Sequence, residues 1–141
     1  MPRIIRQQKI VAQPEGEELV PLAQWNGEPA VLLGPADDPA ALADRLDALH
    51  VIAIDFPQFT DGRGYSIARL LRERYGFKGE IRAVGEVLPD NISYLARCGF
   101  VAFAPADAAY LNQSLNRFAD FSEAYQSSVE RPQPLFRRRV A

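Results

Sequence analysis

Residues 54–66 bring more chemically useful side chains together than any other segment of this sequence. They read Ile-Asp-Phe-Pro-Gln-Phe-Thr-Asp-Gly-Arg-Gly-Tyr-Ser, which combines two carboxylates, an arginine, two glycines and three hydroxyls. The apolar start of the segment is typical of a buried strand, and its end is typical of the start of a helix. Because ligands of parallel α/β proteins meet the loops that follow the strands, we expect a functional site here.

The second half of this segment has the composition of an anion-binding turn. Gly62 and Gly64 would let backbone amides turn inward, and Arg63 would add a guanidinium fork for an oxyanion. The alternative is an ordinary glycine turn in which Asp61 caps the loop and Arg63 is solvated. The residues predicted to bind an anion or a partner are Thr60, Asp61, Gly62, Arg63, Gly64, Tyr65 and Ser66.

Carboxylates follow two successive apolar runs at matching positions. Asp55 directly follows one run and Glu86 follows the next, so neighbouring strands would bring the two carboxylates close together. Such a pair can divide acid and base roles or hold a divalent cation. Equally, each carboxylate would accept hydrogen bonds from loop amides or pair with Arg63. Asp55, Asp61 and Glu86 are therefore the candidate catalytic residues, and the sequence leaves open whether the chain is an enzyme.

Alternating apolar runs and helical stripes predict the elements that position these groups. Apolar runs occupy residues 30–33, 51–54, 81–84 and 100–103, and each is followed by apolar residues at helical spacing. Three aspartates precede these helical stripes as expected N-caps: Asp38, Asp90 and Asp107. Strands that are apolar on both faces belong to parallel sheets covered by helices.

The sequence therefore predicts an α/β fold of four βα units with a mainly parallel sheet. Four units are too few to close a barrel, so we expect an open or partly curled sheet resembling an incomplete barrel. A small β-hairpin precedes it. We expect one α/β domain over residues 1–130, with the hairpin and an irregular connection in 1–28 and the βα repeats in 29–125. Residues 131–141 form a proline- and arginine-rich tail.

Composition narrows the functional classes. The net charge of −2 gives no broad basic surface for nucleic acid, and no apolar run approaches a membrane span. Cys98 and His50 are the only residues of their types, which excludes an intrachain disulfide or a Cys/His metal site. We predict no cofactor and no metal site. Early charges at Arg3 and Arg6 argue against a secretory leader, so a cytoplasmic location is expected.

Two segments resemble one bacterial family. They are residues 55–72, centred on Asp-Gly-Arg-Gly-Tyr-Ser, and residues 79–85, Gly-Glu-Ile-Arg-Ala-Val-Gly, followed by Arg-Cys-Gly-Phe at 97–100. The sequence is similar over nearly its whole length to the domain of unknown function 934 family, whose members are often labelled probable oxidoreductases of sulfite reduction. Members commonly have aspartate where this chain has Glu86, which keeps the carboxylate, and aspartate where it has Val101.

The resemblance implies a place in sulfate assimilation, because genes of this family often accompany those for sulfite reductase. We expect an accessory protein of assimilatory sulfite reduction that binds a pathway enzyme, such as sulfite reductase, or a small sulfur oxyanion through residues 55–66. The alternative is a small enzyme acting on an anionic substrate, with Asp55, Asp61 and Glu86 as acid–base or metal-binding groups. An incomplete barrel exposes strand edges, so a homodimer is also expected.

Overall fold

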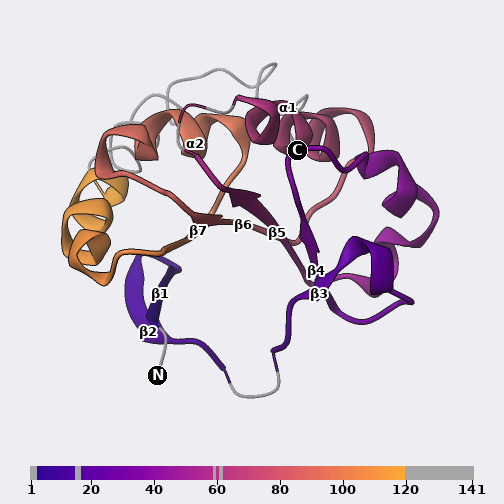
Figure 1. The fold of residues 1–141 in the computed structure, drawn as a ribbon, viewed down its shortest axis with the longest axis horizontal. Coiled ribbons are helices and arrows are strands. Elements are labelled where there is room, and N and C mark those ends of the chain that lie inside the picture. Colours follow the sequence, from indigo (N-terminus) through magenta and orange to yellow (C-terminus); the bar gives the residue numbers. More distant parts are fainter. Residues whose placement is uncertain (1–2, 15–16, 59, 61, 120–141) are drawn as a thin grey trace, which may run out of the picture.

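The computed structural model of the chain describes residues 3–14, 17–58, 60 and 62–119. The predicted tail, residues 131–141, and the candidate residue Asp61 lie outside this part of the chain. Seven strands form one open sheet in the order β2-β1-β7-β6-β5-β4-β3 (Figure 1). The strands are β1 (Arg3–Arg6), β2 (Lys9–Ala12), β3 (Val20–Pro21), β4 (Ala30–Leu33), β5 (Val51–Phe56), β6 (Glu80–Gly85) and β7 (Ala102–Pro105).

The four predicted βα units are confirmed, and their strands are neighbours in sequence order. Strands β4, β5, β6 and β7 pair in parallel, one after the next. Because each crossover moves to the adjacent strand with the same hand, all the helices lie on one face of the sheet. Figure 1 shows the sheet curved, with the helices along its outer side. The sheet does not close, as predicted for an incomplete barrel.

Short helical segments follow the strands. They are the 3-10 segments η1 (Leu22–Gln24), η2 (Pro39–Ala48), η4 (Pro89–Asn91) and η5 (Ala108–Tyr110), the α-helices α1 (Arg63–Arg69) and α2 (Ile92–Cys98), and the π segment η3 (Leu70–Arg74). Residues 111–119 are also α-helical. Asp38 and Asp107 cap their segments as predicted, each accepting a hydrogen bond two residues on. The prediction for Asp90 is wrong, because it lies inside η4 and Asn91 precedes α2.

The predicted N-terminal hairpin is confirmed, and it extends the sheet. β1 pairs antiparallel with both β2 and β7, so the hairpin lies at the edge beyond β7. Its turn places Gln7 and Gln8 at φ values of 55° and 64°, which side chains with a Cβ rarely adopt. Strand pairing on both sides of β1 holds this unfavourable turn. The connection predicted as irregular over residues 12–28 contains a further short strand, β3, parallel to β4.

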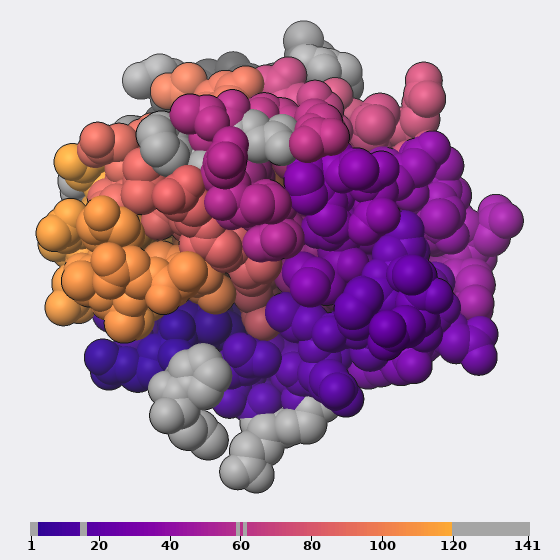
Figure 2. Space-filling model, in the orientation of Figure 1, coloured from indigo at the N-terminus to yellow at the C-terminus, as the bar shows by residue number. Residues whose placement is uncertain are grey.

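The core lies between the sheet and the helices. Alternate residues of each central strand, such as Ile52, Ile54 and Phe56 of β5, join a buried cluster with Leu71 of η3 and Phe100. We call this side of the sheet the helix face and the other side the open face. Figure 2 shows the N-terminal residues, in indigo, packed beneath the orange segment and beside the purple one. Among the described residues, no helix has the length and apolar character needed to cross a membrane.

Candidate functional site

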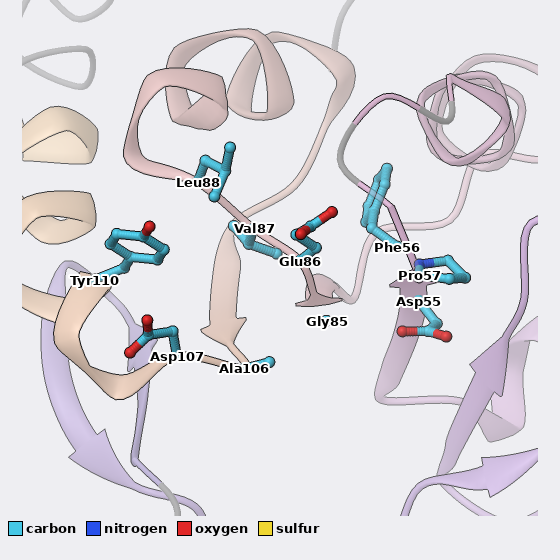
Figure 3. A pocket seen from close by; sticks show the side chains of 10 residues that line it. All are labelled: Asp55, Phe56, Pro57, Gly85, Glu86, Val87, Leu88, Ala106, Asp107 and Tyr110. Atoms are coloured by element: carbon cyan, nitrogen blue, oxygen red, sulfur yellow. The ribbon is translucent and has the colours of Figure 1, made fainter.

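A pocket of about 440 Å³ lies where strands β5, β6 and β7 end (Figure 3). It occupies the carboxyl edge of the sheet, which is where the sequence places the site. Its volume falls within the range of small-molecule sites, about 300–1,000 Å³. The residues that line it are Asp55, Phe56, Pro57, Gly85, Glu86, Val87, Leu88, Ala106, Asp107 and Tyr110.

Asp55 stands at the end of β5 with its side chain on the open face. Its neighbours Ile54 and Phe56 belong to the core on the helix face, and side chains alternate along a strand. Gly85, opposite Phe56 on β6, has φ +93°, and a Cβ there would lie 2.6 Å from the Asp55 Oδ1. Glycine is therefore required at 85 both for the backbone and for the carboxylate beside it. Burial raises the pKa of the Asp55 carboxyl above its ordinary value.

Glu86 and Asp55 line the same pocket, as the sequence predicts, but their carboxylates diverge. The Glu86 amide donates to the Phe56 carbonyl at 2.8 Å, which joins the two strand ends through the backbone. In Figure 3 the Glu86 side chain rises on the side of Phe56, whereas Asp55 points below the end of its strand. The two carboxylates are therefore not arranged to hold a single ion or reacting atom equally between them.

Asp107 and Tyr110 are pocket residues that the sequence did not identify. Asp107 was interpreted solely as a helix cap, and its Oδ1 does accept a hydrogen bond from the Ala109 amide at 2.9 Å. The signal that would have found it is its place two residues after the fourth strand, near the same edge of the sheet as Asp55 and Glu86. Three successive strand ends thus carry a carboxylate each.

The pocket is acidic. Its described lining includes three carboxylates and neither lysine nor arginine, while Phe56, Val87 and Leu88 supply apolar walls. Like charges repel strongly where water is partly excluded, so this lining disfavours a bound oxyanion and favours a hydrogen-bond donor or a cation. Within the described residues no group of acidic, histidine or cysteine side chains has the arrangement needed to hold a metal ion.

The residues predicted to bind an anion follow the pocket residue Pro57 along the chain. Thr60, Gly62, Arg63 and Ser66 are exposed, and none of them lines the pocket. Tyr65 is half-buried, with its ring 5.4 Å from Phe56 and 4.8 Å from Tyr94. The described members of the predicted set are therefore divided between exposed positions and positions packed on the core, and they continue into α1.

The two glycines of this segment have roles other than the one their spacing indicated. Gly62 has φ −83°, an ordinary right-handed conformation, so the alternating backbone of an anion nest is not formed there. Gly64 is buried in α1, and a Cβ at this position would lie 2.6 Å from the Phe56 ring. Gly64 is thus explained by close packing of the helix on its strand. Anion binding by residues 60–66 stays a prediction.

A second polar site, on the open face, was missed at the sequence level. Arg82 of β6 is fully buried, and with Arg6, Glu17 and Glu80 it forms a closed ring of ion pairs. We call these four residues the ion-pair ring. Arg82 Nη2 lies 2.9 Å from a Glu17 oxygen and 2.7 Å from a Glu80 oxygen. The available signal was an arginine in the middle of an otherwise buried strand.

The fold and pocket define a class: an α/β domain with an open, mainly parallel sheet and a binding pocket across neighbouring strand ends. A comparison with family models then identifies the family. The model described as "Bacterial protein of unknown function (DUF934)" matches residues 30–136, and the chain belongs to this family. No curated protein matches the chain.

Proposed function

We propose that this chain is an accessory protein of assimilatory sulfite reduction and that it binds an enzyme of that pathway through residues 57–66. The pathway is inferred from the family resemblance, because genes of this family often accompany those for sulfite reductase. The observation that carries the binding role is the combination of exposure and anchoring in this segment. Pro57, Gln58, Thr60 and Arg63 are exposed, yet both ends of the segment are fixed to the core.

The anchoring comes from aromatic packing beneath the segment. Phe56 is 3 % exposed and contacts the rings of Tyr65 and Phe100, at centroid distances of 5.4 and 5.8 Å. Gly64 allows the first turn of α1 to lie directly on the Phe56 ring. Because the described residues at the two ends of the segment pack on the core, they lose little conformational freedom on binding, which favours recognition of a protein partner.

The acidic pocket supports a protein partner over a free oxyanion at this edge of the sheet. Asp55, Glu86 and Asp107 line the pocket beside the segment, and the three carboxylates would repel sulfite or sulfate. A protein partner can instead meet the exposed residues of the segment with neutral or basic groups. Of the two ligands that the sequence allows for residues 55–66, the enzyme is therefore the better match.

A small enzyme is the second candidate, favoured by one observation. Asp55 lines a pocket of suitable size, and burial raises the pKa of its carboxyl, as is common for acid–base residues. Glu86 would be the second group, while Asp61 lies outside the described residues. A substrate with a hydroxyl or cationic group suits this lining better than the anionic substrate that the sequence indicates.

Co-purification with the enzymes of sulfite reduction tests the proposal at the level of binding. Arg63→Ala removes an exposed side chain from the segment, and Arg74→Ala is a matched control at the exposed end of η3. We expect sulfite reductase, or another enzyme of the pathway, to co-purify with the wild type and the Arg74 variant and to be depleted with the Arg63 variant. Equal recovery with all three proteins would reject the role of residues 57–66.

Growth of a deletion strain tests the pathway. We expect the strain to grow on sulfide but not on sulfate or sulfite, with rescue by the wild-type chain and by the Arg74 variant. Normal growth on all three sulfur sources would contradict the pathway assignment. Growth on sulfite but not on sulfate would place the step before sulfite reduction and would also contradict the proposal.

A further inference from the structure

In the ion-pair ring, two arginines are arranged as in an anion-binding site, and the side chain of Glu17 takes the place of the anion. The Glu17 carboxylate lies between two guanidinium groups, with one oxygen 2.7 Å from Arg6 Nη2 and the other 2.9 Å from Arg82 Nη2. Glu17 belongs to the connection between β2 and β3, whereas both arginines are fixed on strands of the sheet. We propose that Arg6 and Arg82 form a binding site for a small multivalent oxyanion, which Glu17 occupies in the free protein.

The site is built into the sheet. Arg82 is fully buried at the centre of β6, and its register partners on both neighbouring strands are alanines, Ala53 of β5 and Ala102 of β7. Arg6 joins from β1, where it is also paired with Ala102. Because these neighbouring side chains are small, they leave space on the open face for the two guanidinium groups. Burying a guanidinium is costly, so an arginine here is expected to have a role beyond stability.

One donor of the site is unused, and this is the observation that points to a different ligand. Arg82 Nε and Nη2 both bond to carboxylates, but the buried Nη1 has no hydrogen-bond partner within the described residues. Glu17 presents only two oxygens, and one arginine already engages each of them. A tetrahedral oxyanion has further acceptor oxygens, so it can satisfy donors that a planar carboxylate leaves unpaired.

The charges of the site also favour an anion once Glu17 withdraws. Two arginines would then face Glu80 as the single carboxylate of the ring, which leaves one excess positive charge in a largely buried place. Apart from its bonds to the two arginines, Glu17 makes two backbone hydrogen bonds within the described part of the chain. Its amide donates to the Pro14 carbonyl at 3.3 Å, and its carbonyl accepts from Gln13 Nε2 at 3.0 Å. Oxyanion and Glu17 therefore compete for the same donors.

The choice of oxyanion follows from size and charge. A ligand that replaces one carboxylate between two arginines must be compact, be negatively charged and offer more acceptor oxygens than a carboxylate, so that it can use the additional donor. Sulfate, sulfite and phosphate share this chemistry. The proposal goes beyond the proposed function and does not depend on it, because the ion-pair ring lies on the open face and residues 57–66 do not contribute to it.

Glu17→Gln compared with Glu18→Gln tests the site. Glu18 is the adjacent, exposed glutamate, so its variant changes the same charge without touching the ring. We expect calorimetric titration with sulfate to give at least about tenfold tighter binding to the Glu17 variant than to the wild type or the Glu18 variant. Titrations with phosphate and with chloride at equal ionic strength separate oxyanion preference from general screening. Adding Arg6→Gln to the Glu17 variant should abolish the gain.

Equal affinity of the Glu17 and Glu18 variants for sulfate would overturn the proposal, as would equal binding of chloride. If the Glu17 variant does not fold, hydrogen exchange of the wild-type chain gives the answer. Sulfate should then accelerate exchange at the Glu17 amide, because the anion displaces its side chain. No change in exchange up to saturating sulfate would contradict the proposal. Loss of partner binding by the Arg63 variant has no bearing on this outcome, so the two proposals fail separately.

Discussion

The two faces of the sheet bury different kinds of side chain: the helix face buries apolar side chains, and the open face buries charged ones. On the helix face, Ile52, Ile54 and Leu71 are fully buried among apolar neighbours. On the open face, the neighbouring strand β6 presents Arg82 and Glu80, which form ion pairs with Glu17 and Arg6. An apolar core needs only shape and volume, whereas a buried charge needs each partner in place. The polar face is therefore costly for stability, and this difference points to a functional reason for keeping it.

The largest effect should come from breaking the ion-pair ring. Arg82→Met leaves Glu17 and Glu80 facing Arg6 alone and should lower the free energy of unfolding by about 3–5 kcal/mol. Leu71→Met, the same new residue on the helix face, should cost less than about 1.5 kcal/mol. Urea denaturation of both variants measures the difference.

A double variant sharpens this comparison. Arg82→Met combined with Glu80→Leu leaves the Arg6–Glu17 pair at 2.7 Å and replaces the rest with apolar side chains. We expect most of the lost stability to return, because replacing a buried pair is far cheaper than breaking it. If the double variant were as unstable as Arg82→Met, the charges of the open face would be required for stability, and no functional reason would be needed to explain them.

Gly64→Ala should give the next largest effect, on the helix face. The new Cβ would lie 2.6 Å from the Phe56 ring, so the first turn of α1 must shift and the chain should lose about 1–3 kcal/mol. Gly62→Ala is the matched control, because its nearest atom would be 3.9 Å away and its φ is −83°. The control should be neutral or more stable by up to about 1 kcal/mol. Similar losses in both variants would contradict the packing role of Gly64.

Glu17→Gln should have a smaller effect that depends on pH. Burial opposes ionisation of Glu17, but hydrogen bonds from Arg6 and Arg82 outweigh it and hold the pKa of this carboxyl below its ordinary value. Its contribution is therefore complete above the unfolded pKa of about 4.3 and disappears as pH falls through the lower folded pKa. At pH 7 the variant should lose about 1 kcal/mol in urea denaturation. A stability difference unchanged down to pH 2 would contradict the ion-pair role.

Asp55→Asn should give the smallest effect, with the opposite sign. Burial raises the pKa of Asp55, so the ionised carboxylate opposes folding at neutral pH, and this cost disappears as pH falls through the raised pKa. The variant should melt at a slightly higher temperature at pH 7 and at the wild-type temperature in acid. A lower melting temperature at pH 7 would show that the Asp55 carboxylate is instead stabilised by its surroundings.

Most of the fold could be predicted from local patterns in the sequence. The apolar runs at residues 30–33 and 51–54 coincide with β4 and β5, because strands buried on both faces leave a continuous apolar signature. The run at 81–84, which Arg82 interrupts, lies in β6. The short strand β3 left no signature. It consists of Val20 and Pro21 alone and exists because β4 is beside it.

The site was predictable only where one strand end could be compared with the next. Topology brought Asp55 and Glu86 to one pocket, but their positions do not match as predicted: Glu86 follows β6, whereas Asp55 lies inside β5 and pairs with Val84. The ion-pair ring could not be found in this way, since Arg82 and Glu17 lie 65 positions apart. Their contact depends on how the β2–β3 connection crosses the open face, and no local pattern encodes that path.

The most direct test of the proposed oxyanion site on the open face is a crystal structure of Glu17→Gln grown with selenate. It is compared with a structure of Glu18→Gln grown under the same conditions. Selenate has the shape and charge of sulfate, and its anomalous signal identifies it without ambiguity. The account predicts a selenium peak between Arg6 and Arg82 in the Glu17 variant and none there in the Glu18 variant. Water alone between the two arginines of the Glu17 variant, at saturating selenate, would contradict it.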